Sequence, residues 1–212
     1  MNGRAASDIL CVAAAAVLLA MTAASILQAQ SATYEVNTGF FCAFMCLVPM
    51  IFRRARVLDL PLTLIVMIEA AIFLHAYGVL LMRYDDVQVW DTVTHTISSV
   101  TVALCAFYAL MAVSVLDPMV KITRKWTPFL IVVLVMAFGA YWESFEFAVD
   151  ELFGTNMQYS PWDTFRDLLC DVLGGTVVAV YSFIYLKHRS EKDFIEALNI
   201  HPALTRVAKS RG

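Results

Sequence analysis

Charged residues are scarce in this chain. Only 16% of its 212 residues are Asp, Glu, Lys or Arg, whereas soluble domains carry roughly 25%. Hydrophobic residues make up 60% of the chain, compared with roughly 45–50% in soluble domains. A chain with so few charged and so many apolar residues is typical of an integral membrane protein, and the composition predicts membrane lipid as its main surroundings.

The chain also lacks a basic excess and any low-complexity tract. Its formal net charge is −3, so it has no basic field with which to attract nucleic acid. It contains no tract rich in Ser, Gly and Pro and no block of like charges, which are the features that mark disordered arms. Nucleic-acid binding and disordered arms are therefore excluded.

Cysteine is too rare, and its surroundings too apolar, for a disulfide scaffold. The cysteines are Cys11, Cys42, Cys46, Cys105 and Cys170. All five lie inside apolar runs, whereas secreted scaffolds space their cysteines through polar loops. We expect buried, unpaired thiols, and Cys42 and Cys46 are the one pair separated by a single helical turn.

Six apolar stretches are long enough to cross a bilayer, which takes roughly 20 residues in helical form. They cover residues 9–28, 38–52, 60–82, 92–116, 128–152 and 164–186. The first resembles a signal peptide, but only a short polar turn separates it from the next run, which favours a retained helix. The predicted fold class is all-α, a polytopic six-helix transmembrane bundle. We expect a single domain over residues 1–186 and a cytoplasmic tail over 187–212.

Basic residues gather at one end of these helices. Of the 15 Lys and Arg residues, 13 lie at that end, and only Arg83 and Arg166 lie opposite. Because cytoplasmic segments carry the excess of Lys and Arg, we predict a multi-pass protein of the cell membrane with both termini in the cytoplasm. Of the 18 carboxylates, 11 lie in the outer loops or outer helix halves, so the outer face is predicted to form an acidic bowl. The sequence carries no signal for the oligomeric state.

Two of the predicted helices carry stripes of carboxylates at helical spacing. The first stripe, in ESFEFAVD, is Glu143, Glu146 and Asp150; the second, in DTFRDLLCD, is Asp163, Asp167 and Asp171. Steps of three and four residues place each stripe on one helical face, and the deepest members reach about 12 Å below the surface. Ionisable groups at such depth are costly unless they are paired, metal-bound or neutralised, and they normally face the bundle interior. Two facing carboxylate stripes would repel, so a cation or protons must lie between them.

Two further helices add histidines and another acid. Asp91 and His95, in DTVTH, are one turn apart and can present a carboxylate and an imidazole to a common ligand. Upstream, Glu69 lies near the middle of the membrane and His75 lies closer to the outer face. We expect three further buried polar groups. They are Glu69 as a buried acid, His75 as a hydrogen-bonded histidine, and Asp150 as a member of the first stripe.

An internal repeat links two of these segments. WDTVTHTISSVTVAL begins at Trp90 and WDTFRDLLCDVLGGTVVAV begins at Trp162, which is 72 residues later. At that offset Asp91 matches Asp163 and His95 matches Asp167. Both hairpins run in the same sense, so the repeat would be parallel about an axis along the membrane normal, with polar faces converging on that axis. The alternative is that WDT only marks helix starts, with Asp as N-cap and Trp as interfacial anchor.

The motifs WDTVTH, WESFE and SPWDTFRDLLCDVLGG together resemble the VanZ-like group of bacterial membrane proteins, and still more its YjdF-type relatives. Those proteins pair an Asp and a His at one helix start with a later Glu-bearing helix and a D-x3-D-x3-D-x2-G helix start. The resemblance covers roughly residues 60–186. VanZ-like members are associated with teicoplanin resistance and the cell envelope, so the resemblance implies a role in the envelope.

The residues support three functions. The first is a metal-dependent hydrolase or phosphotransfer enzyme acting on a phosphate-bearing envelope lipid, with Mg²⁺ or Mn²⁺ rather than Zn²⁺ because carboxylate-rich sites suit hard cations. Its metal ligands would be Asp91, Glu146, Asp163, Asp167 and Asp171, and its catalytic residues His95 and Glu143. The alternatives are a proton- or cation-coupled transporter and a non-catalytic envelope protein that binds a cation or a head group. No polar trail continues from Asp171 to the cytoplasmic side, which favours a one-sided site over a transport path.

Overall fold

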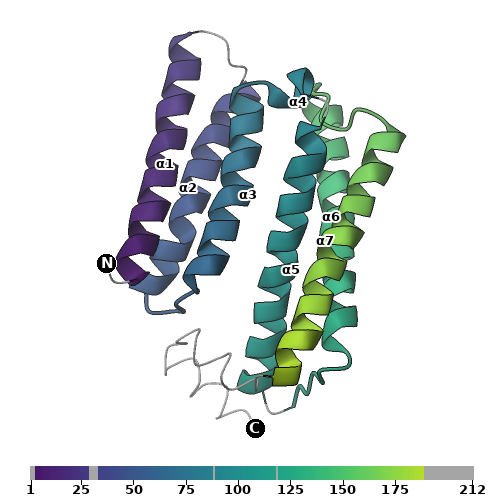
Figure 1. The fold of residues 1–212 in the computed structure, drawn as a ribbon. Coiled ribbons are helices and arrows are strands. Elements are labelled where there is room, and N and C mark those ends of the chain that lie inside the picture. Colours follow the sequence, from purple (N-terminus) through teal and green to yellow (C-terminus); the bar gives the residue numbers. More distant parts are fainter. Residues whose placement is uncertain (1–2, 29–32, 88, 118, 189–212) are drawn as a thin grey trace. The chain divides into compact units, whose positions relative to one another are not determined.

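The computed structural model describes residues 3–28, 33–87, 89–117 and 119–188, and all regular secondary structure in these ranges is helical. The helices, drawn in Figure 1, are α1 (Gly3–Leu27), α2 (Thr33–Arg54), α3 (Leu62–Leu80), α4 (Arg83–Asp86), α5 (Trp90–Leu116), α6 (Thr127–Phe153) and α7 (Pro161–His188). Short helix α4 was not expected. The other six are long and apolar enough to cross a membrane, so the predicted all-α class with six spanning helices is confirmed.

Several helices extend beyond the apolar runs that predicted them. Helix α2 begins at Thr33 rather than at residue 38, and its first turn contains Glu35, an acid that interacts favourably with a helix N-terminus. Helix α7 begins at Pro161 and continues to His188. Hydropathy detects only the part of a helix that suits hydrocarbon, and polar residues continue these helices beyond it.

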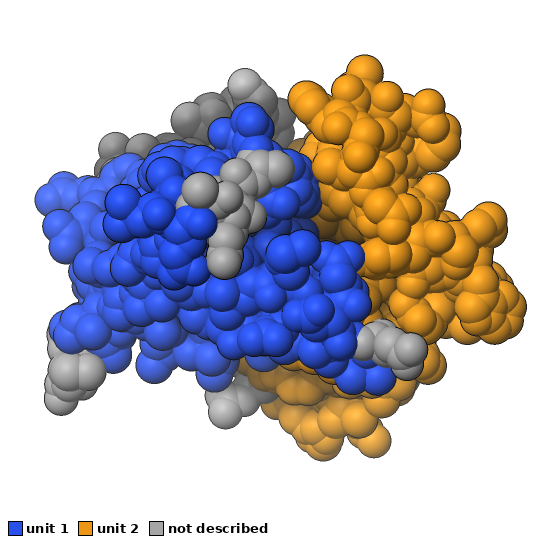
Figure 2. Space-filling view, turned by 90° about the horizontal axis from the view of Figure 1, so that it is seen from above, with its two compact units in different colours: residues 1–90, 195–211 blue, residues 91–194, 212 orange. Residues whose placement is uncertain are grey.

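The chain divides into two compact units, which Figure 2 colours separately. Among the described residues, unit 1 extends to Trp90 and unit 2 begins at Asp91. The single domain predicted over residues 1–186 stays a prediction. The predicted cytoplasmic tail lies outside the described residues, apart from Lys187 and His188 at the end of α7.

Unit 1 packs α1, α2 and α3 around small side chains. Its buried core contains Ala15, Leu18, Cys42, Ala43, Cys46 and Ala76, and small residues let membrane helices approach closely. One end is held by ion pairs: Asp8 pairs with Arg53 and, at 3.3 Å, with Arg54, while Arg4 Nε lies 2.8 Å from Asp59 Oδ2. These contacts tie the start of α1 to the end of α2 and to the connection that follows it.

The cysteines are unpaired. All five are free thiols; Cys105 is half-buried and the other four are buried. Cys42 and Cys46 lie in the core of unit 1 without forming a disulfide. The expectation of free thiols is therefore confirmed. Their expected burial is confirmed for four of them, and Cys105 is less buried than expected.

In unit 2, two glycines lie at close contacts between neighbouring helices. A Cβ at Gly174 on α7 would lie 2.8 Å from Ser99 Cβ on α5, and a Cβ at Gly139 on α6 would fall on the carboxylate of Asp171 on α7. Neither place has room for a side chain unless its neighbour shifts, so glycine permits the close contact there. At Gly175 a Cβ would make only ordinary contact with Val135, at 3.4 Å.

The distribution of side chains is that of a membrane protein. Large apolar side chains face outward, for example Phe41, Leu173 and Val177, each more than 60% exposed. Charged side chains lie inside: Asp167 is 2% exposed and Asp171 is 5% exposed. Soluble proteins show the opposite preference, whereas ionisable residues of membrane helices normally face the bundle interior.

The predicted topology can be tested by cysteine labelling. Asn156, exposed in the connection between α6 and α7, is expected to lie outside the cell, since this connection is far from the basic segments. The variant Asn156→Cys should therefore react with a membrane-impermeant maleimide in intact cells. Lys121→Cys, exposed before α6, should react only after permeabilisation, and the unsubstituted protein gives the background of the native thiols. Protection of Asn156→Cys from the maleimide in intact cells would contradict the predicted topology and indicate the opposite one.

Candidate functional site

The acids of the two predicted stripes gather at one end of unit 2, where α5 and α7 begin and α6 ends (Figure 1). We call this the acidic end of unit 2. Its buried members are Glu143, Glu146, Asp163, Asp167 and Asp171, and its half-buried members include Asp91 and His95. The prediction that both stripes face the interior is confirmed for these five buried acids.

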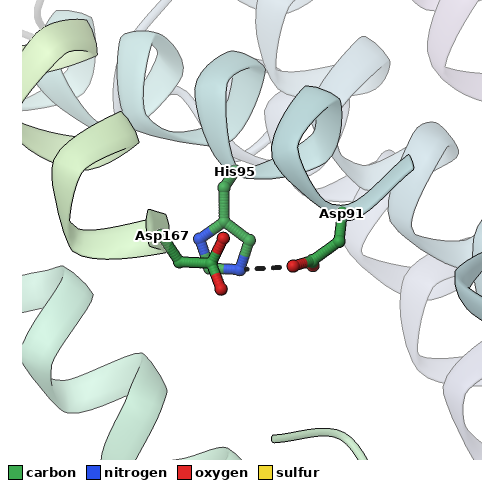
Figure 3. A group of neighbouring side chains, drawn as sticks. All are labelled: Asp91, His95 and Asp167. Carbon is green, nitrogen blue, oxygen red and sulfur yellow. Dashed lines mark ion pairs between the residues drawn. The ribbon is translucent and has the colours of Figure 1, made fainter. Parts of the chain in front are cut away.

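Asp91, His95 and Asp167 form the tightest group of donors. One ligand atom from each of the three lies within 4.8 Å of the other two, and His95 Nε2 lies 3.6 Å from Asp91 Oδ1. Figure 3 shows Asp91 and His95 on one helix, α5, with Asp167 reaching them from α7. The four-residue step along α5 places the first two donors on one face, and the neighbouring helix supplies the third.

Positions matched by the 72-residue repeat meet between α5 and α7. His95 matches Asp167, and both belong to the group of three donors. Ser99 matches Asp171, and the Ser99 hydroxyl donates a hydrogen bond to Asp171 Oδ1. Because both pairs advance by four residues, α5 and α7 run parallel and in register. The predicted approach of His95 to Asp167 is confirmed. The helix before α5 belongs to unit 1, so the parallel repeat of whole hairpins stays a prediction.

Arg166 lies among three aspartates. Its NH2 group donates hydrogen bonds to Asp163 Oδ1 and, at 3.3 Å, to Asp91 Oδ2, and its Nε lies 3.9 Å from Asp167 Oδ1. The guanidinium thus supplies a positive charge of the kind that the facing stripes require. Sequence analysis placed Arg166 at the outer end and assigned it no ion pair, although its three-residue spacing from Asp163 predicts an ion pair on one helix face.

Ser160, rather than Asp163, caps α7. The Asp163 N–H lies 3.2 Å from Ser160 Oγ and 3.0 Å from Ser160 O, and α7 begins at Pro161, a residue well suited to the first helical position. Helix α5 likewise begins at Trp90, one residue before Asp91. The alternative that both aspartates serve as N-caps is therefore wrong, because both lie within the first helical turn.

The α6 stripe borders this group. Glu146 Oε1 accepts a hydrogen bond from Trp142 Nε1 at 2.8 Å. Glu143 Oε2 lies 3.5 Å from Gln158 Nε2, while its Oε1 is buried with no hydrogen-bond partner in the described ranges. Glu143 and Glu146 both interact electrostatically with Asp167. Of the predicted metal ligands, Asp91 and Asp167 lie with His95, whereas Glu146, Asp163 and Asp171 lie outside that group and accept hydrogen bonds from other side chains.

Asp150 organises the connection between α6 and α7. It accepts hydrogen bonds from Thr155 Oγ1 at 2.6 Å, from the Met157 N–H at 2.7 Å and from the Gln158 N–H at 2.9 Å. Asp150 is half-buried rather than buried as expected, because it lies at the last turn of α6, beside this connection. Its contacts indicate a structural role that places Gln158 near Glu143.

The two remaining predicted polar groups belong to unit 1. Glu69 is 3% exposed, and neither carboxylate oxygen has a hydrogen-bond partner in the described ranges, so its predicted burial is confirmed. His75 is half-buried rather than buried, because it lies near the end of α3, where its Nδ1 is 3.0 Å from the Tyr84 hydroxyl. Neither residue contributes a donor to the group of three in unit 2.

Comparison with known proteins yields one family. Residues 9–188 match the model of a family described as "Predicted membrane protein (DUF2238)", a range that includes all of α2 to α7 and most of α1. Neither the comparison with curated proteins nor that with solved structures gives a match. The family description states a location in the membrane and no activity.

Proposed function

This chain belongs to the DUF2238 family of predicted membrane proteins, and we propose that it binds a divalent cation through Asp91, His95 and Asp167. YjdF-type proteins form a DUF2238 family, in agreement with the closer of the two resemblances. The wider VanZ-like resemblance, and with it a role in the cell envelope, is part of the proposal.

One observation carries the proposal. Donors from two helices converge within 4.8 Å, and one of them, Asp167, is 2% exposed with an Oδ1 atom that has no hydrogen-bond partner among the described residues. A buried carboxylate oxygen without a donor is costly. A bound cation would satisfy it.

Charge balance favours a divalent over a monovalent ion. When ionised, Asp91, Asp163 and Asp167 carry three negative charges, and Arg166, which lies among them, supplies one positive charge. A divalent cation would neutralise the two charges that remain on these aspartates, and the buried Glu143, Glu146 and Asp171 nearby can only add negative charge. Uncompensated charge inside a membrane protein is expensive, so this match supports the assignment.

Mn²⁺ fits the donor set best. Carboxylates suit Mg²⁺ and Mn²⁺, but Mg²⁺ prefers oxygen ligands throughout, and here one donor in three is an imidazole. The carboxylate majority in turn favours Mn²⁺ over Zn²⁺. Ligand atoms lie about 2.0–2.2 Å from such ions, so binding would draw the three side chains inward from their separations of up to 4.8 Å.

Three protein ligands would leave positions on the cation for water and for a substrate oxygen. We infer metal-dependent hydrolysis or phosphotransfer on a phosphate-bearing lipid of the cell envelope, because such an ion polarises a phosphoryl oxygen and activates a bound water. Glu143, whose Oε1 is buried without a partner in the described ranges, is the residue we assign to accept the proton of that water. His95 would serve as a ligand. A protein that only holds the head group would use the same site without turnover.

Cation binding is tested by thermal unfolding of the purified protein with and without Mn²⁺. A ligand that binds only the folded state stabilises it by about 2.7 kcal/mol when its free concentration is 100 times the Kd. Asp167→Asn should lose most of the Mn²⁺-dependent rise in melting temperature. Glu151→Gln, which removes an exposed carboxylate from the same end of unit 2, should keep it.

Two outcomes would end the cation proposal. One is an equal Mn²⁺ response in Asp167→Asn and Glu151→Gln, which would make the carboxylates purely structural. The other is a wild-type protein that retains no Mn²⁺ in electron paramagnetic resonance titrations, where the signal of free Mn²⁺ falls when the ion binds.

A further inference from the structure

We propose that Arg166 and the divalent cation together form a binding site for a phosphate group, with Asp163 holding Arg166 in position. This inference rests on the proposed cation site and names the residues that would hold the phosphate group there. The ligand is a phosphate oxyanion, either free or carried as the head group of a lipid.

Arg166 has more hydrogen-bond donors than its two hydrogen bonds use. A guanidinium offers five N–H donors, and both hydrogen bonds that Arg166 makes within the described residues come from its NH2 group. Its Nε is buried and has no hydrogen-bond partner in the same ranges. The nearby carboxylate oxygen, Asp167 Oδ1, is 3.9 Å away, which is too far for a hydrogen bond. An acceptor that reached Nε would satisfy a buried donor.

The charge pattern favours phosphate, and only when the cation is bound. Arg166 is the one basic side chain at the acidic end of unit 2 in the part of the chain that the structure describes. Without a cation, the surrounding carboxylates outnumber it and would repel an anion. With a divalent cation bound to Asp91 and Asp167, the cation and Arg166 together balance the three aspartates, so that both can bind phosphate oxygens. The planar group of Arg166 matches such oxygens in two-point hydrogen bonding.

Asp163 is the positioning residue. It lies three residues before Arg166 on α7 and pairs with it through the same NH2 group that reaches Asp91. A cation bound to Asp91 would compete with Arg166 for that carboxylate, and Asp163 would then remain as the anchor. The Arg166 side chain is 37% exposed, so a ligand approaching the acidic end can reach it.

The experiment measures phosphate binding to the full chain by calorimetry. The protein is loaded with Mn²⁺, freed of excess ion and titrated with inorganic phosphate or, in a second arm, with a short-chain phosphatidic acid. Binding is expected with Mn²⁺ and not without it. Preference for phosphatidic acid would identify a lipid head group, and preference for inorganic phosphate a free anion.

Arg166→Gln should weaken phosphate binding about tenfold or more, the loss expected for a charge-assisted hydrogen bond. Its Mn²⁺ affinity should stay the same or rise, because a competing positive charge is removed. Arg166→Lys keeps the charge without the planar fork and should bind phosphate at an intermediate level. The matched control Arg83→Gln replaces an arginine that is half-buried, as Arg166 is, and paired with Asp86 at 3.8 Å; it should bind as the wild type does.

Asp163→Asn tests the positioning role separately. It should weaken phosphate binding while the Mn²⁺ titration is retained, because Arg166 is present but no longer anchored. Wild-type phosphate affinity in Arg166→Gln, or equal phosphate binding with and without Mn²⁺, would overturn the inference. Mn²⁺ binding without phosphate binding would overturn it and leave the cation site standing, whereas absence of Mn²⁺ binding would overturn both.

Discussion

Replacing Gly139 by Ala should lower the free energy of unfolding by about 1–3 kcal/mol, the usual cost of forcing an extra methyl group into a packed interior. A Cβ at this position would fall on Asp171 Oδ2. The Asp171 carboxylate is 5% exposed and accepts a hydrogen bond from Ser99, so it cannot move aside without losing that bond. Either the carboxylate rotates and loses that bond or α6 and α7 move apart, and unfolding in detergent measures the cost.

Two controls make this prediction specific. Gly175→Ala places its Cβ at an ordinary contact distance from Val135, 3.4 Å, and should cost little. The second control is the double variant Gly139→Ala/Asp171→Ala. Its new Cβ at position 139 would lie 3.5 Å from the Cβ of residue 171 and would meet no carboxylate. The cost of Gly139→Ala should shrink in that background. An equal cost in both backgrounds would show that the carboxylate is not the obstacle.

Replacing Glu69 by Met should raise the free energy of unfolding by about 1–3 kcal/mol, the cost that mutational data assign to a buried polar group without a hydrogen bond. Glu69 is 3% exposed, and neither carboxylate oxygen has a hydrogen-bond partner in the described ranges. Only the thiols of Cys11 and Cys46 approach it as donors within the described ranges, and thiols donate weak hydrogen bonds. Methionine is flexible enough to fill the same space without an unpartnered oxygen. The same unfolding assay measures the gain.

Glu146→Met is the contrasting variant. Glu146 is also buried, but its Oε1 accepts a hydrogen bond from Trp142 Nε1 at 2.8 Å, so replacing it removes that bond and should lower stability. The two substitutions are chemically identical and should differ in sign. Loss of stability in Glu69→Met would indicate that the thiol contacts stabilise the carboxyl group, and the view of Glu69 as an unpartnered acid would be wrong.

Much of the candidate site could be predicted from spacing. Asp91 and His95 share a helix face because they are four residues apart, and the 72-residue offset between the two WDT segments brought Asp167 to the level of His95. Equivalent positions of parallel helices lie at equal depth, so the repeat predicted a contact between residues far apart in the chain. The structure bears this out for His95 with Asp167, and for Ser99 with Asp171, a pair that sequence analysis did not name.

The partners of the other acids could not be predicted in the same way. Asp91 is hydrogen-bonded to Arg166 of another helix and Glu146 to Trp142 on its own helix, although helical spacing alone allows each of them other neighbours. Which contact forms depends on side-chain rotamers and on how far each helix is rotated about its axis. Periodicity identifies the inward face of a helix but not the partner that this face meets.

Hydropathy and the helical period were enough to establish the all-α class, the six spanning helices and the inward orientation of the carboxylate stripes, because each depends on a single segment in contact with lipid. Only the tertiary structure shows that Asp91, His95 and Asp167, out of a larger set of ionisable residues, lie together. The same holds for the position of Arg166 among the aspartates. Both depend on how closely α5, α6 and α7 approach, which Gly139 and Gly174 permit and no single helix encodes.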